Sequence, residues 1–362
     1  MYESLGIDVL TPRQASLLFG GALGLVFGAL ALVSGFCLRR AIAGAREERA
    51  PALGLWMVAL ATAVAGTQAA ASLGLVDFAG HRLVADRLPV LAVLLGGALF
   101  GAGMVLARGC ASRLTVLAGS GNLRAALVMV VFAVVALATM RGVLAPLRVG
   151  LGGVTLPAGG LLPGGAALWT TLLTAAAGAL ALRGRIGLRG LAFGLALGAL
   201  VPLGWVGTGF VLADDFDPIP LESLSFAGPW AETMFWTVAA TAVPAGFGTG
   251  LVAGTLLGSL AAALATRRFA WASFAAPAET GRYLAGGALM GFGGVLAGGC
   301  TVGAGLGGLP TLGTAAALAL LAIAAGAHAT DRLLNPRPVS APPSAVRGSG
   351  ARETTPPPQP AA

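Results

Sequence analysis

The chain has little charge for its length, and it has no lysine at all. Charged residues make up 10% of its 362 residues, whereas about 25% is usual for a soluble globular domain. Hydrophobic residues make up 57%. All 22 basic residues are arginine, and they fall between long uncharged stretches. This composition excludes an ordinary soluble domain. It also makes the net charge of +8 a property of loops that orient membrane spans, so we expect no nucleic-acid partner.

Cysteine and histidine are scarce as well, with three and two residues. Three scattered cysteines without a Cys-x-x-Cys pair exclude a disulfide framework. The two histidines, His81 and His328, lie far apart in the sequence and favour structural roles. No nucleotide-binding motif occurs. The sequence therefore predicts no cofactor, no metal site and no catalytic residue, and we expect a protein that is not an enzyme.

Windows without any charged residue predict the fold class. A bilayer-spanning helix needs about 20 apolar residues, and most of these windows supply them. We expect an all-α, polytopic helical membrane protein with about nine spans plus short re-entrant helices. The opening letters MYESLGIDVLTPRQ carry acids and no basic start, so the first apolar segment is expected to be a retained span. The windows are 14–38, 50–76, 88–107, 125–140, 149–182, 190–213, 233–266 and 283–330.

Composition also predicts how the chain is divided. We expect a polar lead at 1–13, an N-terminal half at 14–165, a C-terminal half at 166–330 and a disordered proline-rich tail at 331–362. Segment 142–165 is rich in glycine and proline and is expected to be irregular or re-entrant. An acidic loop follows at 214–232. Segment 233–266 exceeds one span and contains Pro244, which predicts a broken or kinked helix.

The division into halves rests on a repeated phrase. GGALFGAGMVLARGC at 96–110 and GGALMGFGGVLAGGC at 286–300 match at 11 of 15 positions with an offset of 190. A weaker match joins 19–36 to 193–210, ending in Gly-Phe in both copies. Cys37 follows the first of these endings, whereas Val211 follows the second. The order and spacing of the two matches favour two related halves, parallel or inverted.

The glycine content of the phrase predicts broken helices. Segment 283–330 contains 48 uncharged residues, which would extend about 70 Å as one helix against a hydrocarbon core of about 30 Å. It must therefore turn within or beside the membrane, where irregular backbone survives only when protein or water covers it. We expect a half-helix to end near Cys110 or Cys300. A short segment then begins with Ser112 or Thr301 as its N-cap.

A structural interpretation competes with this one. Gly-x-x-x-Gly spacing is common at plain helix contacts, and cysteine often fills apolar cores. Two cysteines at equivalent repeat positions, Cys110 and Cys300, favour function, whereas Cys37 taken alone favours packing. On the functional interpretation, valine at Gly109 or Gly299 disrupts the centre, while Gly24→Ala in an ordinary span is expected to be mild.

Three motifs resemble those of one known family. The segment GGALMGFGGVLAGGCTVGAGLGG is similar to the C-terminal signature of the YeeE/YedE sulfur-transport family. The segment GAGMVLARGCASRLTVLAGSGNLRA resembles its N-terminal signature, and SGFCLRRAI resembles a third element near the end of the first span. The resemblance implies an hourglass-shaped membrane protein with central cysteines. It also implies location in the bacterial inner membrane and thiosulfate uptake, with possible delivery to a cytoplasmic sulfur-carrier protein.

The resemblance also implies site residues. Thiosulfate, or a related sulfur anion, would pass by S–H hydrogen bonds along Cys37, Cys110 and Cys300. Arg108 and Arg113 flank Cys110 and could hold the anion. Gly109, Gly299 and Thr301 complete the predicted supporting set, because glycine-rich turns offer backbone N–H groups to an anion.

Two other functions remain open from the residues alone. One is a membrane thiol oxidoreductase, for which the fold would have to bring two cysteines together. The other is a soft-metal transporter, which has little support because Met104 and Met290 are not at ligand spacing from the cysteines. Orientation also stays open: the positive-inside rule places 39–49, 183–189 and 267–268 in the cytoplasm and 214–232 outside. The predicted spans satisfy this only if 142–165 crosses the membrane or 166–182 does not.

Overall fold

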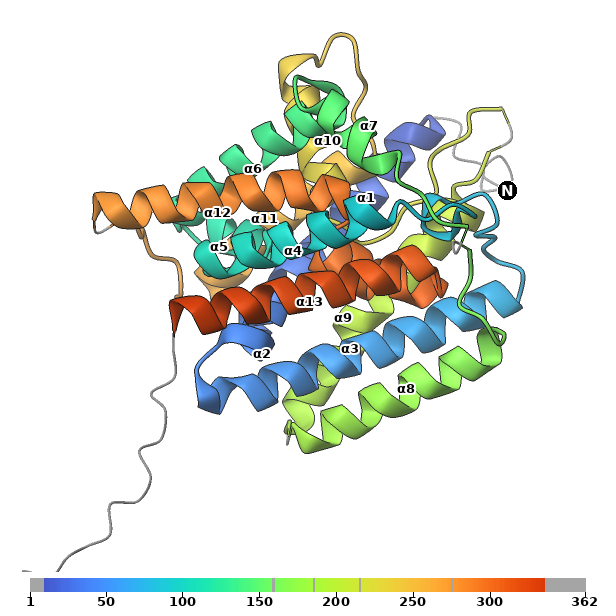
Figure 1. The fold of residues 1–362 in the computed structure, drawn as a ribbon, viewed down its shortest axis with the longest axis horizontal. Coiled ribbons are helices and arrows are strands. Elements are labelled where there is room, and N and C mark those ends of the chain that lie inside the picture. Colours follow the sequence, from blue (N-terminus) through green and yellow to red (C-terminus); the bar gives the residue numbers. More distant parts are fainter. Residues whose placement is uncertain (1–9, 158–159, 185, 215, 275, 336–362) are drawn as a thin grey trace, which may run out of the picture.

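The computed structural model describes residues 10–157, 160–184, 186–214, 216–274 and 276–335, which form a bundle of helices (Figure 1). About 74% of the structure is helical, and the described residues contain no strand. The predicted all-α class is confirmed. The tail predicted at 331–362 lies outside the described residues from 336 onward, as does most of the predicted lead at 1–13.

Within the described residues, nine helical segments are long and apolar enough to cross a membrane, which confirms the polytopic class. Four of these segments contain a break or a change of helix type. The nine are α1 (Pro12–Ser34) with α2 (Leu38–Ala43), α3 (Arg46–Ser72), α4 (Val90–Leu106) with α5 (Ala111–Gly119), α6 (Leu123–Arg141), α8 (Ala166–Arg183), α9 (Leu188–Val206) with the π-helix η3 (Gly207–Val211), α11 (Phe247–Ala265), α12 (Pro277–Leu296) with the π-helix η4 (Thr301–Gly308) and the 3₁₀-helix η5 (Leu309–Thr311), and α13 (Thr314–Leu334).

Of three predictions about where segments begin and end, the structure confirms one and corrects two. The break expected in 233–266 is present, since α10 (Ala227–Val238) and α11 are separate helices on either side of Pro244. The acidic loop is shorter than predicted, because α10 begins at Ala227 rather than after residue 232. The boundary of the tail was also wrong by four residues: α13 continues to Leu334, and Arg49 holds Asp331 in a 3.1 Å ion pair.

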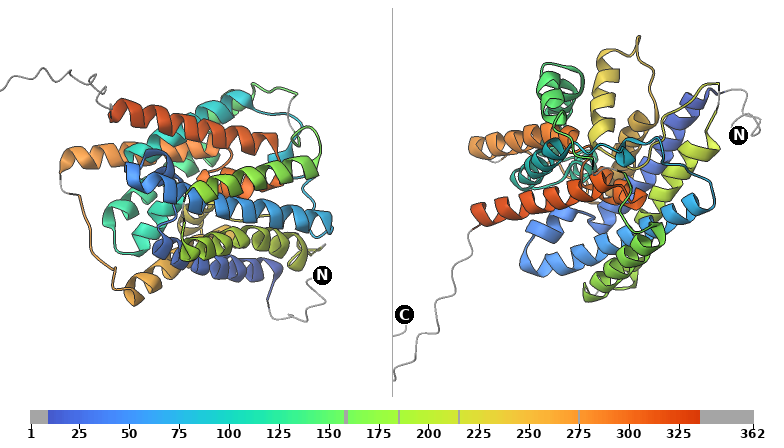
Figure 2. Two further views of the ribbon diagram at one scale, coloured as in Figure 1. Left: turned by 90° about the horizontal axis from the view of Figure 1, so that it is seen from below. Right: turned by 45° about the vertical axis from the view of Figure 1, so that its right-hand side comes forward.

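Segment 142–165 does not span the bundle. It holds one short helix, α7 (Ala145–Gly152), followed by irregular chain that pairs with residue 88 through Leu156. The helix α8, by contrast, is a candidate span with little of its surface buried, and it lies on the outside of the bundle (Figures 1 and 2). Segment 142–165 therefore does not cross the bundle, and the span predicted at 166–182 is present as α8. With the nine described spans alternating in direction, the three arginine-rich connections still fall on one side, as the positive-inside rule requires.

Close glycine contacts establish the direction of the helices. Gly20 of α1 faces Phe247 of α11, and Gly28 faces Thr255, so these two helices run parallel. They are the first and seventh spans, as alternation requires. All three arginine-rich connections then lie on one side, the arginine face, formed by the α2–α3, α8–α9 and α11–α12 connections. The opposite side, the acidic face, holds segments 73–89, 142–165 and 212–226.

The two copies of the repeated phrase pack against each other. A Cβ placed on Gly96 of α4 would lie 2.7 Å from the carbonyl oxygen of Gly293 in α12, and one on Gly293 would lie 2.5 Å from that of Gly96. Gly103 and Gly286 show the same mutual contact, at 2.5 and 2.8 Å. The two helices therefore run antiparallel. Adding 190 turns Gly96 into Gly286 and Gly103 into Gly293, so the two contacts are equivalent under the repeat. The copies are thus inverted rather than parallel.

Equivalent helices of the two copies also have equivalent neighbours. Gly97 and Gly101 of α4 pack on α13, while the equivalent Gly287 and Gly291 of α12 pack on α6. Likewise α1 packs on α11, and α9 packs on α3. This reciprocal packing supports the proposal of two halves at 14–165 and 166–330. The structural interpretation of Gly-x-x-x-Gly spacing is confirmed for these glycines, because each serves a helix contact.

Gly24 is one of these contacts, and the expectation that Gly24→Ala is mild was wrong. A Cβ on Gly24 would collide with the backbone carbonyl of Leu251 and lie 2.9 Å from the nitrogen of Thr255. We predict that Gly24→Ala destabilises the protein by about 1–3 kcal/mol through overpacking. Thermal unfolding of the detergent-solubilised protein measures this. Gly178→Ala in α8 is the matched control, since nothing lies within 4 Å of its Cβ; equal melting temperatures for the two variants would contradict the packing argument.

Candidate functional site

All three cysteines stand at the N-cap of a short helix that follows a break. Cys37 precedes α2, Cys110 precedes α5, and Cys300 precedes η4. The predicted breaks are therefore present, but the N-cap prediction was wrong. Ser112 and Thr301 are the second and first residues of their helices, and Cys110 and Cys300 occupy the N-cap positions. Because the first N–H groups of a helix lack internal partners, each sulfur lies where backbone donors converge.

The breaks arise from left-handed backbone at the end of the preceding helix. Gly298 has φ 76° and Arg108 has φ 55°, at equivalent positions of the two copies. After α4, the N–H of Gly109 donates to the carbonyl of Met104 at 3.1 Å, and the N–H of Arg108 donates to that of Val105 at 3.2 Å. This pair of bonds is the Schellman arrangement, which terminates a helix. Glycine at position 298 adopts it without the steric cost that an arginine carries.

The thiols are buried and lie close together. The exposed fractions of Cys37, Cys110 and Cys300 are 3%, 1% and 0%, and all three are free thiols. Cys37 Sγ lies 4.0 Å from Cys110 Sγ, and Cys110 Sγ lies 3.3 Å from Ser112 Oγ. The helices α5 and η4 are in contact, so the two copies of the phrase converge beyond their breaks. We call Cys37, Cys110 and Cys300, with Ser112 and Thr301, the cysteine cluster.

The sulfur atoms face backbone N–H groups. Cys300 Sγ accepts a hydrogen bond from the N–H of Gly303 at 3.3 Å. The corresponding N–H groups at Cys37 and Cys110, those of Arg40 and Arg113, lie near the sulfur without a cap hydrogen bond. A sulfur that accepts from the backbone keeps its own S–H proton available for another acceptor. The cluster is therefore arranged to donate weak hydrogen bonds.

Thr301 adds a hydroxyl without a partner. Its side chain is 0% exposed, and Oγ1 makes no hydrogen bond, although the thiol of Cys110 is a near neighbour. A buried, unsatisfied hydroxyl costs about 1–3 kcal/mol. A polar ligand in the cluster would remove that cost, so Thr301 is placed as a supporting residue would be.

The structure separates the two arginines that flank Cys110. The side chain of Arg108 is exposed. Arg113 points inward: its guanidinium donates to the carbonyl of Ala31 at 3.3 Å and lies near Cys37 and Cys110. Of the two, Arg113 is the one placed to interact with a charge in the cluster, although the sequence motif favoured Arg108 as the supporting residue.

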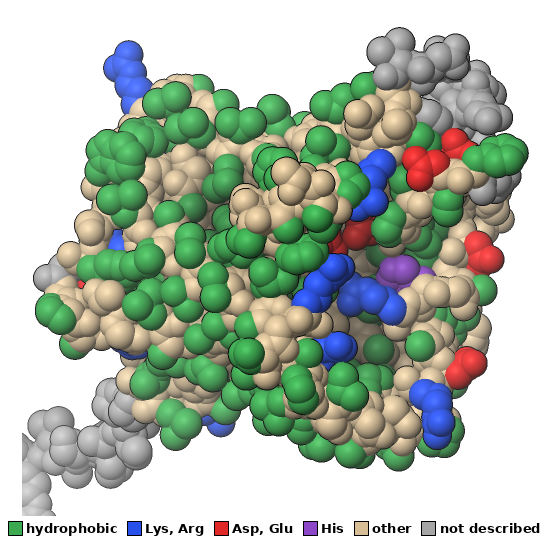
Figure 3. All heavy atoms as spheres, turned by 90° about the horizontal axis from the view of Figure 1, so that it is seen from above, with side chains coloured by type: hydrophobic (Ala, Val, Ile, Leu, Met, Phe, Trp, Pro, Cys, Tyr) green, Lys and Arg blue, Asp and Glu red, His purple; other side chains and the backbone are tan. Residues whose placement is uncertain are grey.

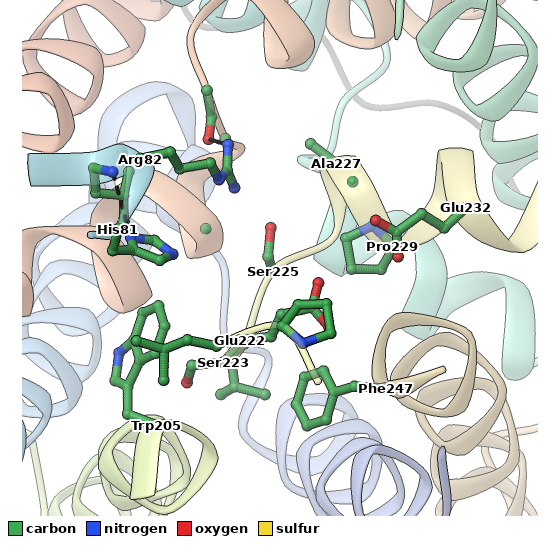
Figure 4. A pocket seen from close by; sticks show the side chains of 18 of the residues that line it. His81, Arg82, Trp205, Glu222, Ser223, Ser225, Ala227, Pro229, Glu232 and Phe247 are labelled. Atoms are coloured by element: carbon green, nitrogen blue, oxygen red, sulfur yellow. Dashed lines mark hydrogen bonds between the residues drawn. The ribbon is translucent and has the colours of Figure 1, made fainter. Parts of the chain in front are cut away.

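A cavity of about 610 Å³ is lined largely by chain of the acidic face, including residues 80–83 and 220–225, and Figure 4 shows it from close by. Figure 3 shows a hollow bordered by basic side chains on the surface of the molecule. We call the cavity the vestibule. Its lining includes Gly298, Gly299 and Gly303, and Gly299 immediately precedes the buried Cys300. Ser225 points into its middle (Figure 4), and a Cβ on Gly303 would collide with the Ser225 hydroxyl. Arg82 donates to the carbonyl of Gly298 at 3.0 Å, which fixes a cation at the break.

Charged side chains gather on the walls of the vestibule. Burial, assisted by the adjacent Arg82 guanidinium, lowers the pKa of His81 to about 4, so the imidazole is neutral at pH 7. Its ring packs edge-on against Trp205, with centroids 5.2 Å apart. Glu222 and Glu232 also line the vestibule. The sequence motifs did not single out these two acids, yet acidic residues are so rare in this chain that their presence was a usable signal.

Buried thiols on helix N-termini, beside a polar-walled vestibule between broken helices, define a class: a multi-pass membrane protein built for transport. The family model described as sulphur transport matches residues 33–329, and the chain therefore belongs to that family. The resemblance to the YeeE/YedE family is confirmed. No curated protein matches the chain significantly.

The supporting glycines are not equivalent in the structure. A Cβ on Gly299 would lie 2.7 Å from the backbone nitrogen of Ala304, whereas one on Gly109 would lie 3.0 Å from the flexible side chain of Leu114. We predict that Gly299→Ala displaces η4 and reduces uptake of a sulfur anion by at least about tenfold, equivalent to about 1.4 kcal/mol. Gly109→Ala should reduce it by less than about threefold, while valine disrupts both sites. Uptake in proteoliposomes measures the difference, and equal losses with alanine would refute the asymmetry.

Arg108→Gly copies the second half of the repeat into the first. Because Arg108 is exposed and left-handed, glycine should relieve about 1 kcal/mol of backbone strain and leave uptake unchanged. Arg113→Gln should weaken uptake instead. If Arg108→Gly abolishes uptake in a protein of unchanged melting temperature, Arg108 holds the anion as the sequence predicted.

Proposed function

We propose that this sulfur transporter takes up thiosulfate, or a closely related inorganic sulfur anion, by relaying it along the thiols of Cys300, Cys110 and Cys37. The observation that carries the proposal is the placement of all three thiols at helix N-caps within one buried cluster. Membership of the sulfur transport family supports the substrate class. The choice of thiosulfate and the relay itself rest on the chemistry of the cluster.

The chemistry of the cluster suits this anion. Thiosulfate carries two negative charges and ends in a soft sulfur, which accepts only weak hydrogen bonds. A thiol is a weak donor, so each contact is shallow, and shallow successive sites let an ion arrive and leave. The hard oxygen atoms need stronger donors. Helix N-termini supply them as backbone N–H groups, and Thr301 supplies a free hydroxyl.

The charge distribution gives the transport a direction. By the positive-inside rule the arginine face is cytoplasmic, so the vestibule faces outward. The anion would meet Arg82 first, then the glycine turn beside Cys300, then Cys110, and finally Cys37 next to α2 at the arginine face. Since Cys300 is fully buried, it is closed off from the vestibule, and passage requires movement of the turn at 298–300.

Two further parts of the proposal concern surroundings and partner. We place the chain in the bacterial inner membrane, because its nine spans need a bilayer and the family resemblance implies that location. We also retain a cytoplasmic sulfur-carrier protein as the receiver of the anion. Such a partner would dock on the arginine face, where Cys37 and α2 lie.

The proposal predicts that Cys110→Ala and Cys300→Ala each reduce uptake of labelled thiosulfate by at least about tenfold, the loss of about one hydrogen bond. Serine should restore little, because a hydroxyl is shorter and a poorer match to a soft sulfur. Uptake into proteoliposomes is the measurement. Thr139→Ala is the matched control, since Thr139 is equally buried but lies on α6 outside the cluster. Wild-type rates in both cysteine variants would refute the relay.

One observation favours a second candidate function. The 4.0 Å separation of Cys37 and Cys110 supplies the close pair that a membrane thiol oxidoreductase needs, which the sequence could not reveal. Uptake under strictly reducing conditions separates the two functions, because a redox relay would stop while hydrogen-bonding thiols would continue. A soft-metal carrier has no such support: among the residues that the structure describes, no group of three His, Cys, Asp or Glu side chains is arranged to hold a metal ion.

A further inference from the structure

We propose that Glu222 and Glu232 form a proton-binding site in the wall of the vestibule, and that its proton is bound together with the transported anion. The inference rests on the proposed function for the identity of that anion. It adds a second, smaller substrate, the proton, at a site that differs in kind from the thiols, since carboxyl groups rather than sulfur atoms hold it.

The two carboxyl groups stand where two cavities meet. Both line the vestibule, and both line a second cavity of about 220 Å³ that Arg13 and Arg141 also line. They come from separate parts of the chain, Glu222 from the irregular segment that follows η3 and Glu232 from α10, yet they face the same space (Figure 4). An anion that occupies the vestibule therefore lies in a space whose wall includes both carboxyl groups.

The backbone holds both groups in position. Glu222 is held against the π-helix η3 by Thr208, whose hydroxyl accepts from the N–H of Glu222 at 3.0 Å and donates to its carbonyl at 2.7 Å. Glu232 rests against the first turn of α11, where a Cβ on Gly248 would lie 2.7 Å from Oε2. The two carboxyl groups are therefore fixed elements of the wall.

Both cations and acids surround Glu222 and Glu232, and their effects on the charge of the pair are opposite. The cations that face it are Arg82 from segment 82–84, Arg13 from α1 and, for Glu232, Arg141 from α6. Other acids on the cavity walls are Asp77 and Asp217, and His81 is neutral.

Burial outweighs these cations. It raises the pKa of Glu222 to about 8, with repulsion from Glu232 adding to the rise, and burial also raises the pKa of Glu232. Both directions favour the protonated form, so the pair holds a proton at pH 7 and loses it as the pH rises through about 8.

The proton decides whether a dianion is tolerated. An ionised pair would set two negative charges beside the path, and each proton bound removes one of them while the arginines keep their charge. Linkage is reciprocal: if the proton favours the anion, the anion must raise the affinity of the pair for its proton. The outward cavity therefore binds anion and proton cooperatively.

Uptake against pH tests the coupling. In proteoliposomes with equal pH on both sides and a clamped membrane potential, labelled thiosulfate uptake by the wild type should fall about tenfold between pH 7 and pH 9, following loss of a proton with a pKa of about 8. Glu222→Gln and Glu232→Gln should each bring that ratio close to one. Asp86→Asn is the matched control, because Asp86 is exposed on the same face, and its ratio should equal the wild-type ratio. A ratio in both glutamine variants that matches the wild type overturns the proposal.

A second measurement does not depend on transport. Infrared difference spectra of the purified full-length protein should contain a protonated-carboxyl band at pH 7 that disappears above about pH 8 and is absent in Glu222→Gln. Thiosulfate should move its midpoint to higher pH, whereas chloride at equal ionic strength should not. Absence of the band at pH 7 refutes the proton site even if uptake is normal. A band with the expected midpoint in a protein that transports no thiosulfate upholds the proton site and refutes the proposed anion.

Discussion

The architecture depends on the contact between two bare helix backbones. The helices α4 and α12 approach so closely that a methyl group at Gly96, Gly103, Gly286 or Gly293 would touch the carbonyl oxygen of the partner helix. Because lipid offers no hydrophobic force between helices, such close van der Waals packing is what holds membrane helices together. The contact is reciprocal, so a change in one copy must be matched in the other. It also explains why the chain repeats one phrase: an antiparallel pair of this kind requires the same glycine face twice.

The chain beyond this helix contact is equally constrained. Each helix of the pair ends in a left-handed residue and restarts as a short helix, and the sulfur of a cysteine occupies the restart. A helix end buried without partners would leave several N–H groups unsatisfied. The sulfur atoms face these groups only weakly, since only Cys300 forms the cap bond. On the proposed function, the remaining donor capacity is what the cluster would offer to an anion. One sequence motif thus has two adjacent parts. Its upstream glycines pack the helices together, and its turn with the cysteine forms the cluster.

The sequence was informative where one physical rule dominates. Length and charge predicted the spans, because a bilayer imposes both, and Pro244 predicted a break, because proline lacks the N–H group of a helix hydrogen bond and crowds the preceding turn. It was less informative where three-dimensional neighbours decide. Gly24 looked like a residue of an ordinary span until α11 was found against it. Arg108 and Arg113 lie on either side of one break, and only the fold shows that the second points inward. Glu222 and Glu232 come together from a loop and a helix whose boundary the sequence misplaced.

The departures from symmetry give the molecule its polarity. A perfect inverted pair would present the same opening to both sides of the membrane. Instead, Gly298 lines the vestibule with bare backbone at the acidic face, while its equivalent, Arg108, projects a charged side chain at the other end of the pair. Likewise Cys37 begins α2 in the first half, whereas Val211 ends a π-helix in the second. The cluster therefore holds three thiols rather than four: two from the first half, Cys37 and Cys110, whose sulfur atoms lie 4.0 Å apart, and one from the second half, Cys300. On the proposed path an anion passes from the single thiol of the second half to the pair of thiols of the first half, so the outward and the cytoplasmic ends of the path present different numbers of S–H donors.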